Sequence, residues 1–213
     1  MSEAYLVPSS DAEAELVKKK SRFIAHIFRV EDEGEALVYL KMMRETYWDA
    51  THNVYAYILH DGTMRYSDDG EPGGTAGMPV LDVLRREGIS QVLCVVTRYF
   101  GGTLLGTGGL VRAYGHSAKL GLEAAGISRR CVWRSVTTEC PYSLYEQLRR
   151  EISSCGGAVT DTLFESNVTI ESIFPEEQTE RFLKRVTEIS AGRLSPLCGD
   201  AQLRDFPVSA ADT

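Results

Sequence analysis

Hydrophobic and polar residues alternate with a period of two in four short segments of the first half of the chain. Residues 13–17 and 22–30 flank three lysines at 18–20, and residues 52–59 and 65–67 flank a His-Asp-Gly turn signal. Alternation with this period is typical of strands that bury one face, and Asp-Gly is a common turn sequence. The pattern therefore predicts two β-hairpins.

Apolar residues at helical spacing predict three helices in the same half, over residues 31–47, 80–87 and from 105 or 106 to 125. Acidic residues begin the first helix, where the helix dipole favours them, and Gly126 supplies a stop after the third. Residues 91–97 (QVLCVVT) form an uninterrupted apolar run. Such a run predicts a strand that is covered on both faces.

The pattern changes near residue 130 and then predicts a second set of elements in the order βαββαβ. We expect these elements at residues 131–140, 143–154, 158–165, 167–174, 176–190 and either 194–198 or 203–208. Ser143 and Glu146 fit a capping box at the start of the first helix of this set. The order βαββαβ is that of a ferredoxin-like domain.

This change of pattern predicts an α+β protein with two domains. We place the first domain at residues 1–128 and the ferredoxin-like domain at residues 131–208, and we read Ser128-Arg129-Arg130 as a short linker. Each stretch has a length that allows a core of its own.

The composition is that of an ordinary globular protein, and the charge narrows the choice of partners. The 213 residues are 43% hydrophobic and carry a formal charge of −7, and neither half of the chain is basic. Any contact with nucleic acid must therefore use a local patch. The start of the chain lacks a signal-like apolar run, and the five cysteines show no C-x-x-C spacing. We expect a cytoplasmic protein with reduced thiols and no membrane partner.

Two glycine-rich segments, residues 67–77 and 98–109, each lead into a predicted helix. Glycine lets backbone N–H groups approach a ligand, and the free N–H groups at a helix start suit an anion. We therefore expect a nucleic-acid or anion site on the second segment and a companion surface on the first. The candidate residues are Arg98, Tyr99, Gly101, Gly102, Gly106, Gly108, Gly109, Arg112 and Tyr114 on the second, and Asp68, Asp69, Gly70, Glu71, Thr75, Ala76 and Gly77 on the first.

Simpler structural explanations stay open for each of these features. Neither segment is a nucleotide-binding motif by rule, and glycine serves tight turns and close packing as well. Asp68, Asp69 and Glu71 could hold Mg²⁺ or act as acid and base with His52, or they could be turn residues. The basic and aromatic residues nearby also fit a solvated helix face and a core. We assign no metal, no cofactor and no catalytic residue.

Two long motifs, SDDGEPGGTAGMP and RYFGGTLLGTGGLVRAYGHSA, closely resemble the YigZ/IMPACT family, and the resemblance covers essentially the whole chain. It implies a first domain that folds like the second domain of ribosomal protein S-five and domain IV of elongation factor G. It also implies a ferredoxin-like second domain similar to domain V of elongation factor G. The family signature falls on residues 68–71, 75–77, 98–102 and 106–114.

Two positions depart from the family pattern. Val54 stands where many relatives have cysteine, which argues against cysteine chemistry at that position. Leu104 stands where some relatives have lysine, which thins any positive patch.

The resemblance implies a regulatory role, because the eukaryotic IMPACT relative opposes activation of the kinase that responds to amino-acid starvation. Our hypothesis is a translation-linked regulatory binding protein that contacts RNA, the ribosome or a ribosome-associated protein partner through its glycine-rich loops. We expect no DNA sequence specificity. Two alternatives remain at this point: an enzyme that acts on a phosphorylated small molecule, and a regulator that binds only protein.

Overall fold

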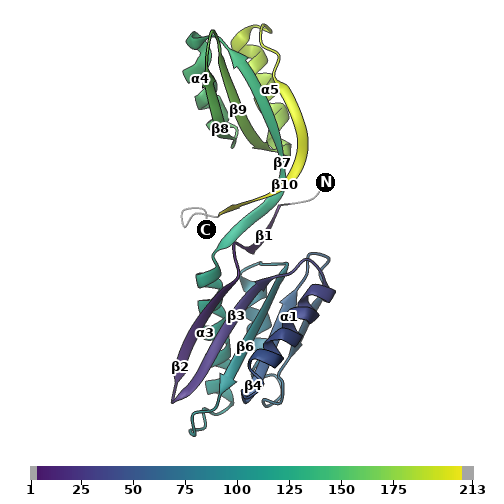
Figure 1. Ribbon diagram of the computed structural model, residues 1–213, viewed down its shortest axis with the longest axis vertical. Helices are drawn as coiled ribbons and strands as arrows, with labels where there is room; N and C mark the ends of the chain where they lie inside the picture. Colours follow the sequence, from purple (N-terminus) through teal and green to yellow (C-terminus); the bar gives the residue numbers. More distant parts are fainter. Residues whose placement is uncertain (1–3, 208–213) are drawn as a thin grey trace. The chain divides into compact units, whose positions relative to one another are not determined.

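The computed structural model describes residues 4–207 and divides them into two compact units (Figure 1). Tyr5–Arg129 makes up most of the N-terminal unit, and Arg130–Arg204 makes up most of the C-terminal unit. Helices and strands occur in both units, which confirms the predicted α+β class with two domains. The exact domain limits stay a prediction. Among the described residues, no helix combines the length and the apolar character needed to cross a membrane.

The N-terminal unit is built on an antiparallel sheet with the strand order β2-β3-β6-β4-β5. Helix α1 packs against one face of this sheet, and α2 and α3 pack against the other, as Figure 1 shows for α1 and α3. In chain order the elements are β1 (Tyr5–Pro8), β2 (Ala12–Lys18), β3 (Ser21–Arg29), α1 (Glu33–Thr46), β4 (His52–Ile58), β5 (Met64–Ser67), α2 (Gly77–Arg86), β6 (Val92–Tyr99) and α3 (Thr107–Ala125).

Strand β6 lies in the middle of this sheet and explains why its sequence is apolar throughout. Cys94 and Val96 belong to the core beneath α2 and α3, whereas Leu93 and Val95 belong to the core beneath α1. Successive side chains of a strand point to opposite faces, so a strand between two helical layers needs apolar residues at every position. The prediction of a strand covered on both faces is confirmed.

The hairpin of β2 and β3 ends in a two-residue turn at Lys19 and Lys20. Lys18 pairs with Ser21 across the two strands, and both turn residues have positive φ, 47° and 67°. Two positive φ values are typical of the type I′ turn, whose twist matches that of the flanking strands. The turn leaves the three lysines exposed at one end of the N-terminal unit.

The C-terminal unit has the ferredoxin-like order of elements and strands. Its strands lie in the order β10-β7-β9-β8, which is 4-1-3-2 in their chain order. Leu148 and Ile152 of α4 and Phe182 and Val186 of α5 form its core with residues of β7 and β9. The elements are β7 (Ile127–Cys140), α4 (Tyr142–Ser154), β8 (Ala158–Phe164), β9 (Val168–Pro175), α5 (Glu176–Ser190) and β10 (Leu197–Pro207).

Three local predictions differ from the structure. The expected linker, Ser128-Arg129-Arg130, is instead part of the continuous strand β7. Helix α4 begins after Pro141 without a side-chain cap, so the capping box of Ser143 and Glu146 does not form; both residues lie inside the helix. Strand β1, which was not predicted, pairs with β7.

The last strand, β10, runs from Leu197 to Pro207, so it overlaps both predicted alternatives and includes all the residues between them. Val208, the end of one alternative, lies outside the described residues.

We predict that Phe182→Ala destabilises the C-terminal unit alone. Phe182 is fully buried and stacks on Phe174 with the ring centroids 4.3 Å apart, and its loss leaves a cavity in a core that the N-terminal unit does not share. We expect the free energy of unfolding of the C-terminal unit to fall by about 3–5 kcal/mol. Hydrogen exchange would show faster exchange in β7, β9 and α5, with unchanged protection in β3 and β6. Equal loss of protection in both units would contradict the independence of the two cores.

Candidate functional site

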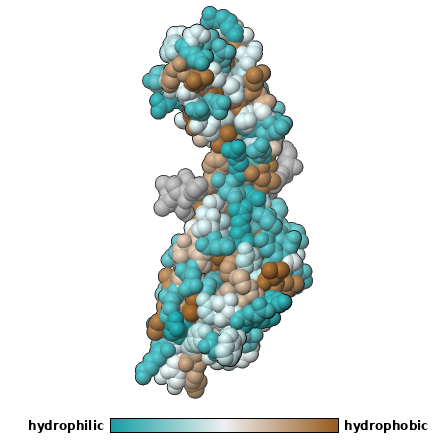
Figure 2. Space-filling view, viewed as in Figure 1, coloured by the Kyte–Doolittle hydropathy of each residue, from teal (hydrophilic) through white to brown (hydrophobic). Residues whose placement is uncertain are grey.

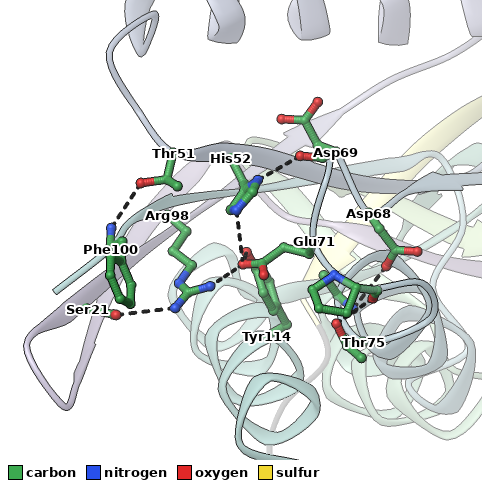
Figure 3. A network of polar contacts seen from close by, with 12 residues as sticks. Ser21, Thr51, His52, Asp68, Asp69, Glu71, Thr75, Arg98, Phe100 and Tyr114 are labelled. Atoms are coloured by element: carbon green, nitrogen blue, oxygen red, sulfur yellow. Dashed lines mark hydrogen bonds and ion pairs between the residues drawn. The ribbon is translucent and has the colours of Figure 1, made fainter. Parts of the chain in front are cut away.

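A buried ion pair joins the first glycine-rich loop of the N-terminal unit to the strand that leads into the second (Figure 3). The first loop, residues 68–76, connects β5 to α2 and carries Glu71; the second loop, residues 100–106, connects β6 to α3 and follows Arg98. The Arg98 guanidinium donates to Glu71 Oε1, and only about 5% of Arg98 is exposed. A charge buried to this degree costs several kcal/mol unless it is paired, so each partner depends on the other.

Tyr114 and His52 complete the surroundings of the Glu71 carboxylate. The Tyr114 hydroxyl, reaching up from α3, donates to Glu71 Oε1 over 2.7 Å. Burial and this hydrogen bond raise the pKa of Tyr114 far above its usual range, so the phenol stays a neutral donor. His52, paired across the sheet with Arg98, has its Nε2 atom 3.8 Å from the same oxygen.

The other two carboxylates of the first loop fold the loop itself. Asp68 accepts hydrogen bonds from the backbone N–H groups of Gly74, Ala76 and Gly77 over 2.8–3.0 Å. Gly77 is the first residue of α2, so Asp68 also holds the start of this helix. Asp69 accepts from the backbone N–H of Asn53 over 2.6 Å. The three predicted acids therefore point to three different partners. Within residues 4–207, no group of three metal-ligating side chains converges.

Two of the predicted site glycines are required by close packing. A Cβ on Gly77 would lie 2.6 Å from the carbonyl oxygen of Ser67, and a Cβ on Gly101 would lie 2.0 Å from the carbonyl carbon of Lys20. Gly101 also donates its N–H to the Ser21 hydroxyl over 3.1 Å, which ties the second loop to the lysine hairpin. At Gly77 and Gly101, close packing of the backbone is therefore sufficient to explain the glycine.

Gly106 serves a different purpose, because it starts α3. It has a φ of 72° and forms the N-cap without a side-chain hydrogen bond, and nothing lies within 4 Å of a Cβ built there. No acidic residue occupies the first turn of α3. The N–H groups of this turn are therefore left for a ligand or for water.

A cavity of about 440 Å³, which we call the loop cavity, opens between the two loops. Its walls are largely apolar, and Glu71, Arg98 and His52 supply polar groups. The lining residues are Thr51, His52, Gly70, Glu71, Pro72, Arg98, Phe100, Leu104, Leu105, Gly106, Thr107 and Leu110.

A second hollow of about 400 Å³, which we call the basic groove, lies on the other side of the first turns of α3. Lys18 and Lys19 from the hairpin and Arg112 and His116 from α3 line it. Among residues 4–207, no carboxylate forms an ion pair with Lys18, Lys19 or Arg112. Figure 2 shows hydrophilic atoms next to hydrophobic ones at this end of the N-terminal unit, where Figure 1 places the hairpin tip and the second loop.

The structure separates residues that the sequence had grouped together. Arg112 and Gly109 line the basic groove, whereas Gly106 and Arg98 line the loop cavity. Tyr114 is fully buried, so its ring cannot stack on a ligand.

Tyr99 and the remaining loop residues lie outside both hollows. Tyr99 donates its hydroxyl to Asp49 over 2.8 Å. Thr75 donates its hydroxyl to the carbonyl of Pro72 over 2.6 Å and so closes a turn of the first loop. Gly102 and Gly108 are exposed, with no atom that would crowd a Cβ at Gly102.

Several residues of these two hollows were not in the predicted set. Lys18 and Lys19 of the basic groove could have been found in the sequence. They belong to three consecutive lysines between two predicted strands, which places them at the tip of a hairpin. Leu104 and Phe100 of the loop cavity were visible as apolar residues inside a glycine loop. His52 was considered only as an acid–base partner of the loop carboxylates and was not placed in the predicted site.

Fold and site together define a class. It is a two-domain α+β protein whose first domain presents two glycine loops, with a buried Arg–Glu pair between the first loop and the strand before the second. The model of the Impact N-terminal domain matches residues 19–122, and a domain of unknown function (DUF1949) matches residues 138–193. The chain is 37% identical to the IMPACT family member YvyE of Bacillus subtilis, over 91% of this chain and 90% of YvyE. This chain belongs to the IMPACT family, as the resemblance indicated.

Other relatives extend this similarity. The IMPACT family member YigZ of Escherichia coli is 30% identical over 92% of this chain and 98% of its own length. A protein IMPACT homolog of Dictyostelium discoideum is 39% identical, but over 47% of this chain and 30% of its own length. A solved structure of a hypothetical protein matches 94% of this chain and 99% of its own with a TM-score of 0.59 and 29% identity.

We predict that Glu71→Gln strongly destabilises the N-terminal unit. The substitution keeps the shape of the side chain but leaves the Arg98 charge buried without a counter-charge. The free energy of unfolding should fall by about 3–5 kcal/mol in a denaturant titration. Glu15→Gln is the matched control, since Glu15 pairs with Arg22 in solvent and its loss should leave the melting temperature unchanged. Equal stability of the two variants would show that the buried pair does not hold the loops.

Proposed function

We propose that this protein is a translation-linked regulatory binding protein that contacts RNA, free or within the ribosome, through the N-terminal unit. The basic groove carries this proposal, since it gathers Lys18, Lys19, Arg112 and His116 on a chain whose net charge is −7. Positive side chains without counter-charges attract phosphate and release its condensed counterions. This function places the protein in the cytoplasm.

The geometry of the groove suits a nucleic-acid backbone better than an isolated anion. Its basic side chains come from two elements, the β2–β3 hairpin and the exposed face of α3, so they line the groove from two sides. Phosphates follow one another along a strand, and basic groups on two elements can contact more than one of them. The N–H groups at the start of α3, beside Gly109, supply further donors of the kind that bind phosphate.

The regulatory part of the proposal rests on family membership. Proteins named IMPACT in eukaryotes are similar to about half of this chain, and the Impact N-terminal domain, residues 19–122, is the part that carries both loops. A regulator that acts by binding needs no catalytic group. Glu71, the carboxylate that a catalytic hypothesis would use, is instead occupied by the Arg98 and Tyr114 donors at Oε1.

We predict that Lys18→Gln and Arg112→Gln each weaken RNA binding and reduce its dependence on salt. Each variant removes one charge that faces a phosphate, so the slope of log K against log salt concentration should fall by about 0.7 for single-stranded RNA. Fluorescence anisotropy of a labelled oligonucleotide at four salt concentrations measures both quantities. The contacts are to phosphate, so the loss should be the same for every sequence.

Lys41→Gln is the matched control for these variants. Lys41 is an exposed lysine of α1, which packs on the face of the sheet opposite to α3. Its substitution should leave the affinity for RNA and the salt slope unchanged. Equal effects of all three variants would indicate nonspecific attraction. Salt-independent binding that none of them alters would refute the RNA proposal and favour a regulator that binds only protein.

A further inference from the structure

We propose that the loop cavity binds one unstacked nucleobase that carries an exocyclic amino group, such as cytosine. The inference rests on the proposed function insofar as the base belongs to bound RNA. A free nucleotide has the same chemistry, and the experiment below separates the two sources.

The walls of the cavity suit a flat apolar body. Phe100 is 46% exposed and Leu104 is 82% exposed, and Pro72 lies on the side of the first loop. A volume of about 440 Å³ is within the usual range for pockets that hold small molecules. Exposed aromatic rings bind unpaired bases by stacking, which is sequence-tolerant because every base has a flat face.

The polar end of the cavity accepts hydrogen bonds. Glu71 is a buried side chain, with 3% of its surface exposed, and all its hydrogen bonds from Arg98 and Tyr114 arrive at Oε1. Oε2 accepts none among the described residues, so it is available as an acceptor on the wall of the cavity. An N–H group of a ligand in the cavity would donate to it.

His52 adds a second acceptor beside the Glu71 carboxylate. Its Nδ1 atom lies 2.7 Å from the backbone carbonyl of Asp69, and a carbonyl can only accept, so Nδ1 carries the proton. In the neutral ring, Nε2 is then an acceptor, and it lies 3.8 Å from Glu71 Oε1. An amino group has two hydrogens and can bond to both acceptors. Uracil, with a carbonyl oxygen in the place of the amino group, would face them with a third acceptor.

The charges around the cavity favour a neutral donor over a cation. The guanidinium of Arg98 already neutralises Glu71, and the positive end of the α3 dipole lies at Gly106 and Thr107 in the same lining. A lysine or arginine from a partner would meet these two positive groups. A nucleotide fits the acceptors and the positive groups alike. Its base would face the acceptors, and its phosphate suits the start of α3 or the basic groove. The cavity and the basic groove adjoin, because Leu105 lines both.

The test compares oligocytidylate with oligouridylate, and CMP with UMP, by titration calorimetry or anisotropy. Wild-type protein should bind the cytidine ligand at least about 5-fold more tightly than the uridine ligand. Phe100→Ala should weaken oligocytidylate binding about 5- to 150-fold by removing the stacking ring. Phe100→Trp should retain binding. Trp48→Ala, which removes an aromatic residue that is 81% exposed outside the cavity, should change nothing.

The outcomes separate this inference from the RNA proposal. Equal binding of cytidine and uridine oligomers, unaffected by Phe100→Ala but weakened by Lys18→Gln, would refute the base site and leave the RNA proposal standing. Binding of CMP with no binding of either oligomer would support the cavity, assign it to a free nucleotide and refute the RNA proposal. Tighter binding of oligocytidylate than of CMP would support both and assign the base to RNA.

Discussion

The buried ion pair between Arg98 and Glu71 is the interaction on which the functional end of the N-terminal unit depends. Arg98 belongs to the central strand and Glu71 to a loop that follows the edge strand, so their pairing fixes this loop to the middle of the sheet. Removing either partner would leave a charge without compensation in the interior. Tyr114 extends the constraint to α3 through its hydrogen bond to Glu71. One carboxylate thus aligns a strand, a loop and a helix.

Glycine makes this alignment sterically possible and leaves two surfaces beside it. The backbone of Gly101 passes so close to Lys20 that any side chain would collide, and this contact brings the lysine hairpin next to the second loop. The start of α3 then divides the surface into a hollow with apolar walls and a hollow with basic walls. A ligand with a flat body and a phosphate combines the chemistry of both. We therefore regard the two hollows as parts of one binding surface.

The sequence predicted the elements well, because their signals are local. The apolar run of β6 and the spacing of Leu110, Ala118 and Leu122 on α3 depend only on neighbouring residues and on burial, and the structure confirms them. Strand β1 was missed because four residues carry little periodicity, and its pairing with β7 joins distant parts of the chain. The capping box failed because Pro141 starts α4 earlier than the serine pattern suggested.

The site could be predicted only in part, since its geometry depends on contacts between distant residues. The glycine loops were visible, but nothing in the sequence distinguishes Gly101, which serves packing, from Gly106, which starts a helix. Arg98 appears as a free cation in the sequence, and its partner Glu71 lies 27 positions away. Lys18 and Arg112 meet in one groove through the pairing of β2 with β3 and the packing of α3 on both.

A crystal structure of the chain bound to a short oligocytidylate would test the central claim most directly, namely that the paired loops form one surface for a base and its phosphate. We expect one cytosine in the loop cavity, stacked on Phe100 with its amino group at Glu71 and His52, and a phosphate beside Lys18 or Arg112. The pair of Arg98 and Glu71 should remain intact. An oligonucleotide bound to α1 or to the C-terminal unit, with both hollows empty, would contradict the account.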